Sequence, residues 1–588
     1  MFKDPNQIED FFGLSQNGKQ PLKDSVKKNG LATKIRLLPK ILSKKERYLI
    51  LAFTLIILGS IIALPFTIYY HYTTAAPDYG GRLTEGIVGE PHSINPLLSQ
   101  INDADRDLVS LIYSGLLQYN PEGKLVPDLA KSYDISSDGL TYTFSLNENA
   151  KWHDLKPITA DDVVFTIRTA QNPDYGSLQR INWQGVDVEK VNDHTVSFKL
   201  KNKYAQFLNN LTLGILPQHI WEQVKPINFS LSEYNVKPIG SGPYMFRKYK
   251  KDALGRIRSY ELASFKEFYN SRPYINEIEI KFYDSEDEMI SEYNHNAIQG
   301  MAYVSPRNLT KVKFKQRLNI HEMKLPRYFG VFFNDNQNKL LADKNIRLAM
   351  NYATNKEELV SKILNGKGSE VYSPLIEGVL DIPRDVKKYS FNLDQAKTIL
   401  TNSGWGNPDE KGILSKGNQK LAIKVTTSTW PELTEVAHLI KEQWAKAGID
   451  ITVESLPTSQ LQASIKERSY QALLFGEILN IDPDPFSLWH SSQKKDPGLN
   501  LSIYENKTAD KLLEEARQTI NPLERIKKYD DFQKIAIEDA PAVFLYTPVY
   551  LYAQSRDVNN FKNTIISMPS DRFSDVEHWY IETERVFD

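Results

Sequence analysis

The strongest constraint on this chain is a run of 23 residues without a charge, over residues 48–70. As an α-helix this run is about 35 Å long, enough to cross a hydrocarbon core of about 30 Å. Three of the four residues at 44–47 are basic, and no acidic or basic residue follows the run until Asp78. The sequence therefore predicts one transmembrane helix over residues 48–70.

The charge on either side of this helix predicts its orientation. Residues 1–47 contain eleven Lys and Arg against five Asp and Glu. Because basic segments stay on the cytoplasmic side, the N-terminus is expected in the cytoplasm and everything after about residue 71 outside it. We interpret residues 1–47 as a cytoplasmic basic tail that contacts anionic lipid. The predicted location is the cell membrane, with a single span and an extracytoplasmic main domain.

A cleaved signal peptide is the alternative reading of the same segment. Thr74-Ala75-Ala76 offers small residues near a cut, but the apolar run is long and 47 residues precede it. The chain has no cysteine, which excludes disulfides, Cys-ligated zinc and an acylated lipoprotein anchor. Anything that holds the chain to a membrane must therefore be a protein segment.

The part after the helix is expected to be a large globular region. Its length favours two or three packed units, and the chain's 41% hydrophobic and 25% charged residues are ordinary for a globular protein. The net charge of -1 argues against nucleic-acid binding. Residues 71–80 are predicted to be a linker. No further transmembrane candidate or low-complexity tract follows.

Strands and helices alternate through this region, which indicates a mixed α/β architecture. Thr141–Leu146 alternates polar with apolar side chains, as a half-buried strand does. Thr159 and Asp162 form a capping-box pattern at a helix start. Other predicted elements are a hairpin over Val188–Leu200, a helical face at Ile346, Ala349, Met350 and Ala353, another at Leu433, Val436, Ala437, Ile440 and Trp444, a strand at Ile449–Val453, and a helix starting at Asn521-Pro522.

Seven segments in order resemble one protein family, the family-5 extracellular solute-binding proteins of ABC importers, the oligopeptide, dipeptide and nickel binding group. The segments are Gly86–Ser99, Leu111–Leu116, Leu125–Ile167, Gly240–Tyr244, Asp343–Ile363, Ala396–Trp405 and Ile503–Tyr546. The third follows the family pattern most closely. It departs from it at Tyr133, where Trp is usual, and at Leu155, where Gly is usual.

The resemblance implies a two-lobed α/β fold of the periplasmic-binding-protein type, class II, in its large form with an extra subdomain. The solute is expected between the lobes and is enclosed when they close. The expected boundaries are residues 81–325 for lobe I with the subdomain, 326–545 for lobe II, and 546–588 for a return to lobe I. Two segments, near Arg327–Asn334 and Ala540–Thr547, are expected to cross between the lobes.

The resemblance also points to Leu473–Trp489 as a ligand-binding segment. In peptide-binding relatives an Asp three residues before a "DP" pair binds the peptide's α-ammonium group. Counting from Asp482, that position here is Leu479, so the usual carboxylate is absent. Glu477 is a candidate substitute if the loop is shifted. The alternative is that Glu477 faces solvent or a neighbouring Arg.

Further ligand-binding candidates come from the same resemblance. Gly476 matches a position whose backbone lines the cleft, where a Gly lets the ligand approach closely. Four aromatic residues lie on segments that often border the cleft, and aromatic faces suit peptide side chains or sugar rings. For each of them core packing is the alternative. They are Trp405, Trp430, Trp489 and Tyr546.

Other motifs are expected to serve the fold. Tyr142, Phe144 and Trp152 are predicted core residues, and Gly240–Tyr244 is predicted to be a packed turn. His153 is expected to be a structural histidine. No HExxH, GxSxG or Walker A motif is present. We therefore predict no catalytic residue, no metal site and no cofactor.

Together these features predict a membrane-anchored, monomeric receptor that captures peptides outside the cytoplasm and delivers them to an ABC permease. One alternative is the same receptor for oligosaccharides or another solute. A second is a ligand sensor that signals through the transmembrane helix. A third is an enzyme, a glycosidase or peptidase that uses the cleft.

Overall fold

The computed structural model describes residues 43–99, 102–376 and 385–587. Most of the predicted basic tail, residues 1–42, lies outside the described residues. The chain divides into two compact units. The first comprises residues 1–76 and 585–588, and the second comprises residues 77–584.

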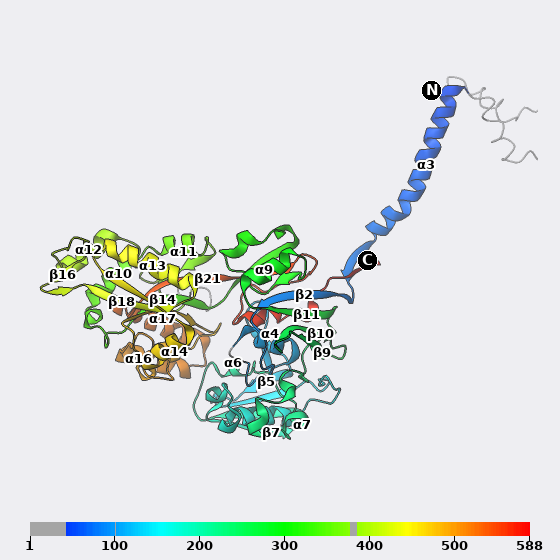
Figure 1. Ribbon diagram of the computed structural model, residues 1–588. Helices are drawn as coiled ribbons and strands as arrows, with labels where there is room; N and C mark the ends of the chain where they lie inside the picture. The colour runs from blue at the N-terminus through cyan, green and yellow to red at the C-terminus, as the bar shows by residue number, and fades with distance from the viewer. Residues whose placement is uncertain (1–42, 100–101, 377–384, 588) are drawn as a thin grey trace, which may run out of the picture. The chain divides into compact units, whose positions relative to one another are not determined.

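The first unit is built around the predicted membrane helix. Helix α3 (Lys44–His71) begins four residues earlier than the apolar run, because Ser43 and Glu46 form a capping box. The backbone N–H of Ser43 donates to Glu46 Oε2 at 2.8 Å, and the N–H of Glu46 donates to Ser43 Oγ at 3.4 Å. Figure 1 shows α3 as one long helix, and none of its residues is buried.

Residues 73–77 form a strand where the sequence favours an irregular linker. Strand β1 (Thr73–Pro77) pairs with β22 (Thr583–Phe587) in a two-stranded sheet. Arg585 strengthens this junction: its Nε donates to Thr73 Oγ1 at 2.8 Å, and its Nη2 donates to the carbonyl oxygens of Tyr70 and Thr73 at 3.1 and 2.6 Å. Since the partner strand is about 500 residues away in sequence, local sequence patterns give no sign of this strand.

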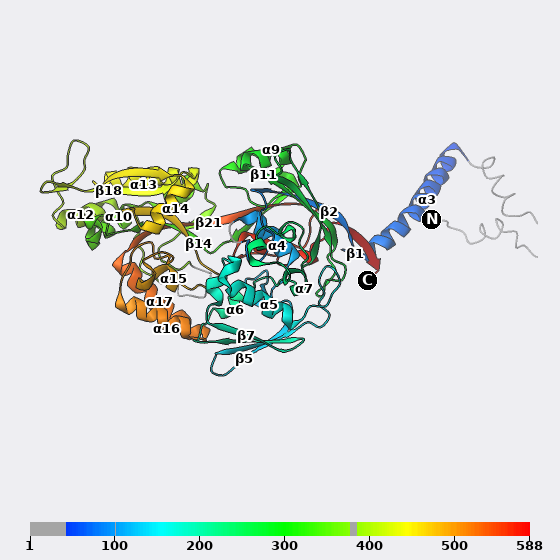
Figure 2. The same ribbon diagram turned by 60° about the horizontal axis from the view of Figure 1, so that its bottom comes forward.

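The second unit is organised on one twelve-stranded mixed sheet (Figures 1 and 2). Its spatial order is β19 (Asp450–Leu456), β18 (Ala422–Ser428), β20 (Ala472–Ile478), β14 (Arg327–Phe333), β21 (Ala542–Ser555), β12 (Gly300–Met301), β2 (Gly80–Val88), β11 (Ile275–Tyr283), β10 (Ile257–Ser264) and β9 (Tyr244–Lys251). Two further strands, β13 (Leu318–Lys324) and β15 (Gly368–Glu370), pair with β21. Strand β21 thus bonds to β14 near its start and to β12 and β13 near its end.

Helices cover both faces of the β14–β18 half of the sheet (Figures 1 and 2). One face packs on α10 (Lys344–Ala353), α11 (Lys356–Ile363), α12 (Leu393–Asn402) and α13 (Pro431–Lys446). The other packs on α14 (Thr458–Glu467), α16 (Lys507–Gln518) and α17 (Pro522–Asp539). Strand β14 contributes to the apolar core on each face, because its side chains alternate. Phe329 and Val331 pack on the α10–α13 side, and Tyr328 and Phe332 pack on the α14, α16 and α17 side.

The remaining half holds the largest apolar core, formed by residues 83–325 and 550–579. It includes α4 (Asp103–Ile112), α5 (Ala160–Gln171) and a four-stranded sheet of β5 (Ala130–Ile135), β6 (Thr141–Leu146), β8 (Thr195–Leu200) and β7 (Val186–Asn192). The hairpin β3 (Leu117–Tyr119) and β4 (Leu125–Pro127) and the short helices α6 (Phe207–Asn210), α7 (Gln218–Trp221) and α8 (Pro226–Phe229) complete it. A smaller core forms around α9 (Glu286–Asn294).

Several local predictions are confirmed. The strand at Thr141–Leu146 is β6, Thr159 and Asp162 form the capping box of α5, and Asn521 caps α17. The two predicted helical faces are the buried faces of α10 and α13. Tyr142, Phe144 and Trp152 are core residues.

The predicted turn at Gly240–Tyr244 is a packed one. A Cβ on Gly240 would lie 1.9 Å from the carbonyl oxygen of Ile112, so only glycine fits there. His153 holds the same turn: the Gly240 N–H donates to Nδ1 at 3.2 Å, and Nε2 bonds to the Gly242 carbonyl oxygen at 3.0 Å. Burial lowers the pKa of His153 to about 4, as suits a neutral structural imidazole.

Candidate functional site

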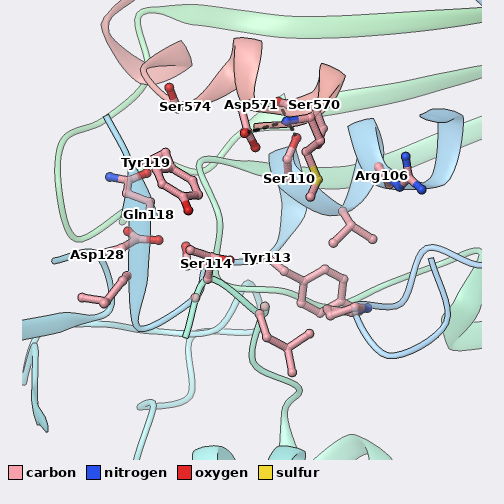
Figure 3. A pocket seen from close by; sticks show the side chains of 18 of the residues that line it. Arg106, Ser110, Tyr113, Ser114, Gln118, Tyr119, Asp128, Ser570, Asp571 and Ser574 are labelled. Atoms are coloured by element: carbon pink, nitrogen blue, oxygen red, sulfur yellow. Dashed lines mark hydrogen bonds between the residues drawn. The ribbon is translucent and has the colours of Figure 1, made fainter. Parts of the chain in front are cut away.

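A cavity of about 320 Å³ lies in the second unit, and its wall, which mixes polar and apolar groups, is assembled from distant parts of the chain (Figure 3). The wall uses α4 and the residues after it, the β3–β4 hairpin, residues 209–214 and the turn η8 (Pro569–Phe573). The loop that follows β20 adds Asn480. Concave sites with several convergent polar groups are the usual form of small-molecule sites.

Helix α4 presents one face to this cavity. Val109, Ser110 and Tyr113 lie three, four and seven residues after Arg106, which is helical spacing, and all four residues line the cavity. The helix starts at a strong cap, since the N–H of Asp105 donates to Asn102 Oδ1 at 2.8 Å. The opposite face of α4 is buried in the core.

The turn η8 supplies a second wall. Asp571 Oδ2 accepts hydrogen bonds from the backbone N–H groups of Ser567 and Met568 at 2.8 and 3.0 Å. Burial raises the pKa of Asp571 to about 6 although these bonds act in the opposite direction. The next residue, Arg572, is fully buried and binds the carboxylates of Asp107 and Glu85.

Two more carboxyl groups line the cavity. Asp128 lies between β4 and β5, and Glu577 lies in the turn η9 (Val576–His578). Burial raises the pKa of Asp128 to about 7, partly offset by the hydrogen bond from the Tyr269 hydroxyl. Burial raises the pKa of Glu577 to about 8.

Amide and hydroxyl side chains make up most of the remaining polar surface. They are Gln118, Gln179, Asn182, Asn209, Asn210 and Asn480, with Ser99, Ser110, Ser114, Thr212, Ser567, Ser570 and Ser574. The Tyr119 hydroxyl donates to Asn209 Oδ1 at 3.0 Å. Such groups both donate and accept hydrogen bonds, as a peptide backbone or a sugar requires.

The predicted ligand segment meets this wall at the loop after β20. Asn209 Nδ2 donates to the carbonyl oxygen of Asp482 at 3.2 Å, and Gln206 Nε2 donates to that of Pro483 at 3.2 Å. The carboxylates of Asp482 and Asp484 are held by Arg525 at 2.8 Å and by Arg517 at 2.7 Å. These two carboxylates therefore fix the loop.

Leu479 and Glu477 are both buried and lie outside the cavity wall. Leu479 packs in the core beside α16 and α17. Glu477 is only 4% exposed and accepts a hydrogen bond from the Tyr328 hydroxyl. The sequence alternative, that Glu477 faces solvent or an Arg, is therefore wrong. Its Oε1 has no hydrogen-bond partner among the described residues, and burial raises its pKa to about 8.

Gly476, Trp430 and Tyr546 come together around Phe329. A Cβ on Gly476 would lie 2.8 Å from the Phe329 ring, and the ring centroid of Phe329 is 6.0 Å from Trp430 and 5.2 Å from Tyr546. Trp430 is 42% exposed, whereas Tyr546 is buried and donates its hydroxyl to Glu432 Oε1 at 3.1 Å. The structure thus groups three of the predicted residues.

Trp405 and Trp489 belong to separate apolar cores and are almost completely buried. In this structure both are core residues. Core packing was the alternative to ligand contact that the sequence left open. Neither they nor the group around Phe329 line the cavity.

Most residues of the cavity wall were not predicted from the sequence, which pointed to residues 473–489 as the ligand-binding segment. The spacing of Arg106, Val109, Ser110 and Tyr113 is a helical signal that the sequence does carry. The contribution of η8 has no such signal, because its contacts with α4 join residues about 460 positions apart.

One group of side chains has the composition of a metal site. Single ligand atoms of Asp575, Glu577 and His578 lie within 4.8 Å of one another. His578 Nδ1 is 2.7 Å from Asp575 Oδ1 and 3.8 Å from Glu577 Oε1. The first of these contacts is a hydrogen bond that already accounts for the orientation of the ring.

Comparison with known protein families gives one match over most of the second unit. The model of the bacterial extracellular solute-binding proteins, family 5 (middle), matches residues 124–499. The oligopeptide-binding protein AppA of Bacillus subtilis is 30% identical over 515 residues, covering 86% of this chain and 92% of AppA. The dipeptide-binding protein of Escherichia coli is 28% identical over 501 residues, covering 80% of this chain and 90% of that protein.

Solved structures give the same result. AppA of Bacillus subtilis in complex with a nonapeptide has a TM-score of 0.71 at 29% identity and covers 86% of this chain and 100% of its own. NikZ of Campylobacter jejuni in complex with Ni(L-His) has a TM-score of 0.72 at 28% identity and covers 85% of this chain and 99% of its own. The two-lobed α/β fold expected from the sequence is confirmed.

Proposed function

Because the chain belongs to family 5 of the bacterial extracellular solute-binding proteins, we propose that it is a membrane-anchored receptor that captures peptides and delivers them to an ABC permease. Proteins of this family are solute-binding receptors of ABC transporters and not enzymes. The peptide, the anchor and the permease are the parts that we propose.

The observation that carries peptide capture is the amide-rich cavity. Its wall combines α4, the β3–β4 hairpin and η8 with Asn480 from the loop after β20. A peptide presents alternating N–H and C=O groups, and six Asn and Gln side chains offer donors and acceptors for them without favouring one sequence. Relatives described as oligopeptide-binding and dipeptide-binding support the same solute class.

Capture requires no bond to be made or broken. A solute that contacts both lobes stabilises the closed arrangement by its differential affinity for the two states. The closed receptor then docks on the permease and releases the solute. Tethering keeps this receptor at a high effective concentration beside the permease.

The anchor is supported by the surface of α3. Its Leu, Ile and Phe side chains are exposed along the whole helix, which is unfavourable in water and favourable in lipid. The basic residues on its N-terminal side favour a cytoplasmic N-terminus. We place residues 77–584 outside the cytoplasm on these grounds.

Peptide capture is tested with the full chain in detergent. Ligands that copurify are identified by mass spectrometry, and binding of pentaalanine is measured by isothermal titration. Saturable binding at one site per chain supports the proposal. If only oligosaccharides copurify and no peptide binds, the receptor serves the alternative solute class.

The anchor and its orientation are tested by thiol labelling, since the chain contains no cysteine. Two single-cysteine variants, Ser43→Cys and Thr401→Cys, are expressed in cells and exposed to a membrane-impermeant maleimide. We expect Thr401→Cys to react in intact cells and Ser43→Cys to react only after permeabilisation. A truncated product that starts near residue 77 and lacks α3 would instead identify a cleaved signal peptide.

A further inference from the structure

One end of the cavity carries two buried carboxyl groups without a cation. Asp128 and Glu577 both line the cavity and are 9% and 5% exposed. They come from opposite ends of the second unit's sequence, yet the charge of Asp128 helps to raise the pKa of Glu577. Buried carboxylates in proteins are normally paired with a cation or a set of hydrogen-bond donors.

The hydrogen-bond partners of these carboxyl groups are few. The Asp128 carboxylate accepts a hydrogen bond from the Tyr269 hydroxyl and one from the backbone N–H of Gly115. Among the described residues, none other than Glu577 itself donates a hydrogen bond to the Glu577 carboxylate. The His578 ring is 3.8 Å from Glu577 Oε1, but its Nδ1 already bonds to Asp575 at 2.7 Å. Neither carboxyl group has a Lys or Arg within ion-pair distance in the described part of the chain.

The basic side chain of this cavity lies elsewhere in its wall. Among the described lining residues Arg106 is the one Lys or Arg, and it pairs with Asp103 at 3.0 Å. Figure 3 shows Arg106 and Asp128 on opposite sides of the cavity. The one basic side chain of the described lining is therefore separated from Asp128 by the cavity.

We propose that Asp128 and Glu577 form the cation-binding end of the cavity, where they receive an ammonium or guanidinium group of the captured solute. This rests on the proposed capture function and names the chemistry that the solute must carry. The cation of the solute would be the ion-pair partner that the protein does not provide for these carboxylates. The ion pair would be strong because it is buried.

The raised pKa values of the two groups support this assignment. Burial raises the pKa of Asp128 to about 7 and that of Glu577 to about 8, so near neutral pH each exchanges a proton for an arriving cation at little cost. Tyr113, which also lines the cavity, has a buried hydroxyl with no hydrogen-bond partner among the described residues. Unsatisfied polar groups of this kind are expected where a ligand completes the site.

The proposal also accounts for the missing Asp at Leu479. Peptide-binding relatives take the ammonium group on the loop that follows β20, whereas in this chain that loop has no free carboxylate facing the cavity. The Asp128 and Glu577 carboxyl groups would hold the same chemical group from another part of the cavity wall.

The test compares a cationic probe with its neutral counterpart. Pentaalanine and N-acetyl-pentaalanine are titrated at pH 7 into the full chain, into Asp128→Asn and Glu577→Gln, and into the control Glu122→Gln, which removes an exposed carboxylate of the same region. All titrations contain EDTA, so that no metal ion occupies the cluster of Asp575, Glu577 and His578. An N-acetylated peptide with one central lysine distinguishes a side-chain ammonium from an α-ammonium.

We expect Asp128→Asn and Glu577→Gln each to weaken binding of a cationic probe at least about thirtyfold. The control should bind like the wild type, and the variants should bind the neutral peptide unchanged. Thermal unfolding of each variant confirms that it is folded. If the wild type binds the neutral peptide as tightly as both cationic ones, the cation subsite is overturned while peptide capture stands.

Failure of peptide capture gives a different result. If no peptide binds, 1,5-diaminopentane, which has two ammonium groups and no peptide bond, is titrated instead. If the diamine binds and Asp128→Asn abolishes that binding, the cation subsite is supported even without a peptide. If the diamine does not bind, the subsite is overturned too.

Proton release provides a check on the unmodified chain. Titrations in two buffers of different ionisation enthalpy should show protons released when the cation binds, and zero release would contradict the proposal.

Discussion

The guanidinium group of Arg572 binds the carboxylate of Asp107 through two hydrogen bonds of 2.8 and 2.5 Å, and neither side chain is exposed. Arg572 also binds Glu85 at 2.6 Å, and the Tyr552 hydroxyl donates to Glu85 at 2.6 Å. Since Asp107 lies on α4 and Arg572 on η8, this cluster joins two walls of the cavity. These side chains do not line the cavity, but their contacts hold its two walls in place.

Arg572→Met should be strongly destabilising. It leaves Asp107 and Glu85 buried without a counter-charge, which costs about 3–5 kcal/mol. Denaturant unfolding of the full chain measures the loss. The control Arg247→Met removes an exposed arginine that pairs with Glu277 and should cost less than about 1 kcal/mol. Equal effects for the two variants would contradict the assigned role.

Asn480→Ala should weaken peptide binding and leave stability unchanged. Asn480 is exposed and lines the cavity, so its amide is available to the ligand. We expect a loss of about 1 kcal/mol in binding free energy, measured by titration with pentaalanine. The matched control is Ile478→Ala, which removes a 61% exposed side chain from the same segment outside the cavity wall. If both variants bind like the wild type, the loop does not contact the peptide.

Glu477→Gln should flatten the dependence of stability on pH. The pKa of Glu477 is raised from 4.5 to about 8, so the folded state favours the protonated form. The associated stability is present below about pH 4.5 and is lost as the pH rises toward 8, on the order of 3–5 kcal/mol. Thermal unfolding at pH 5, 6.5 and 8 should therefore show a smaller decrease for Glu477→Gln than for the wild type.

The same variant tests Glu477 as the substitute for the missing ammonium-binding Asp. Its carboxyl group is buried against Tyr328, so we expect Glu477→Gln to leave peptide affinity unchanged. A loss of at least about 2 kcal/mol in binding free energy would show instead that this carboxylate reaches the peptide.

Binding of a lysine-containing peptide should strengthen with pH. Asp128 and Glu577 lose their protons near pH 7 and 8, whereas the lysine side chain stays charged, so affinity should rise between pH 6 and 8 by up to about tenfold per unit. The N-acetylated peptide with one central lysine is titrated at pH 6, 7 and 8. Asp128→Asn should reduce the slope. The other titratable groups near these two are Tyr269, Tyr244, Asp575 and His578.

Local patterns predicted much of the fold, and tertiary contacts decided the site. The apolar faces of α10 and α13 and the cap at Thr159 depend on neighbouring residues, and all were predicted. The family resemblance drew attention to Leu479 and Glu477, which are buried in the structure. Asp128 and Glu577 line the same cavity only because the chain returns to its first half after β21. Periodicity and propensity do not encode such a relation.

The pairing of β1 with β22 has a consequence for how the chain is made. Thr73 and Arg585 are 512 residues apart, so at about 5–20 residues per second β1 waits roughly 25–100 s for its partner strand to be synthesised. During that interval the backbone of Thr74-Ala75-Ala76 is open to a signal peptidase, and afterwards it is hydrogen-bonded within a sheet. Any cleavage at Thr74-Ala75-Ala76 would therefore have to occur before β22 is synthesised.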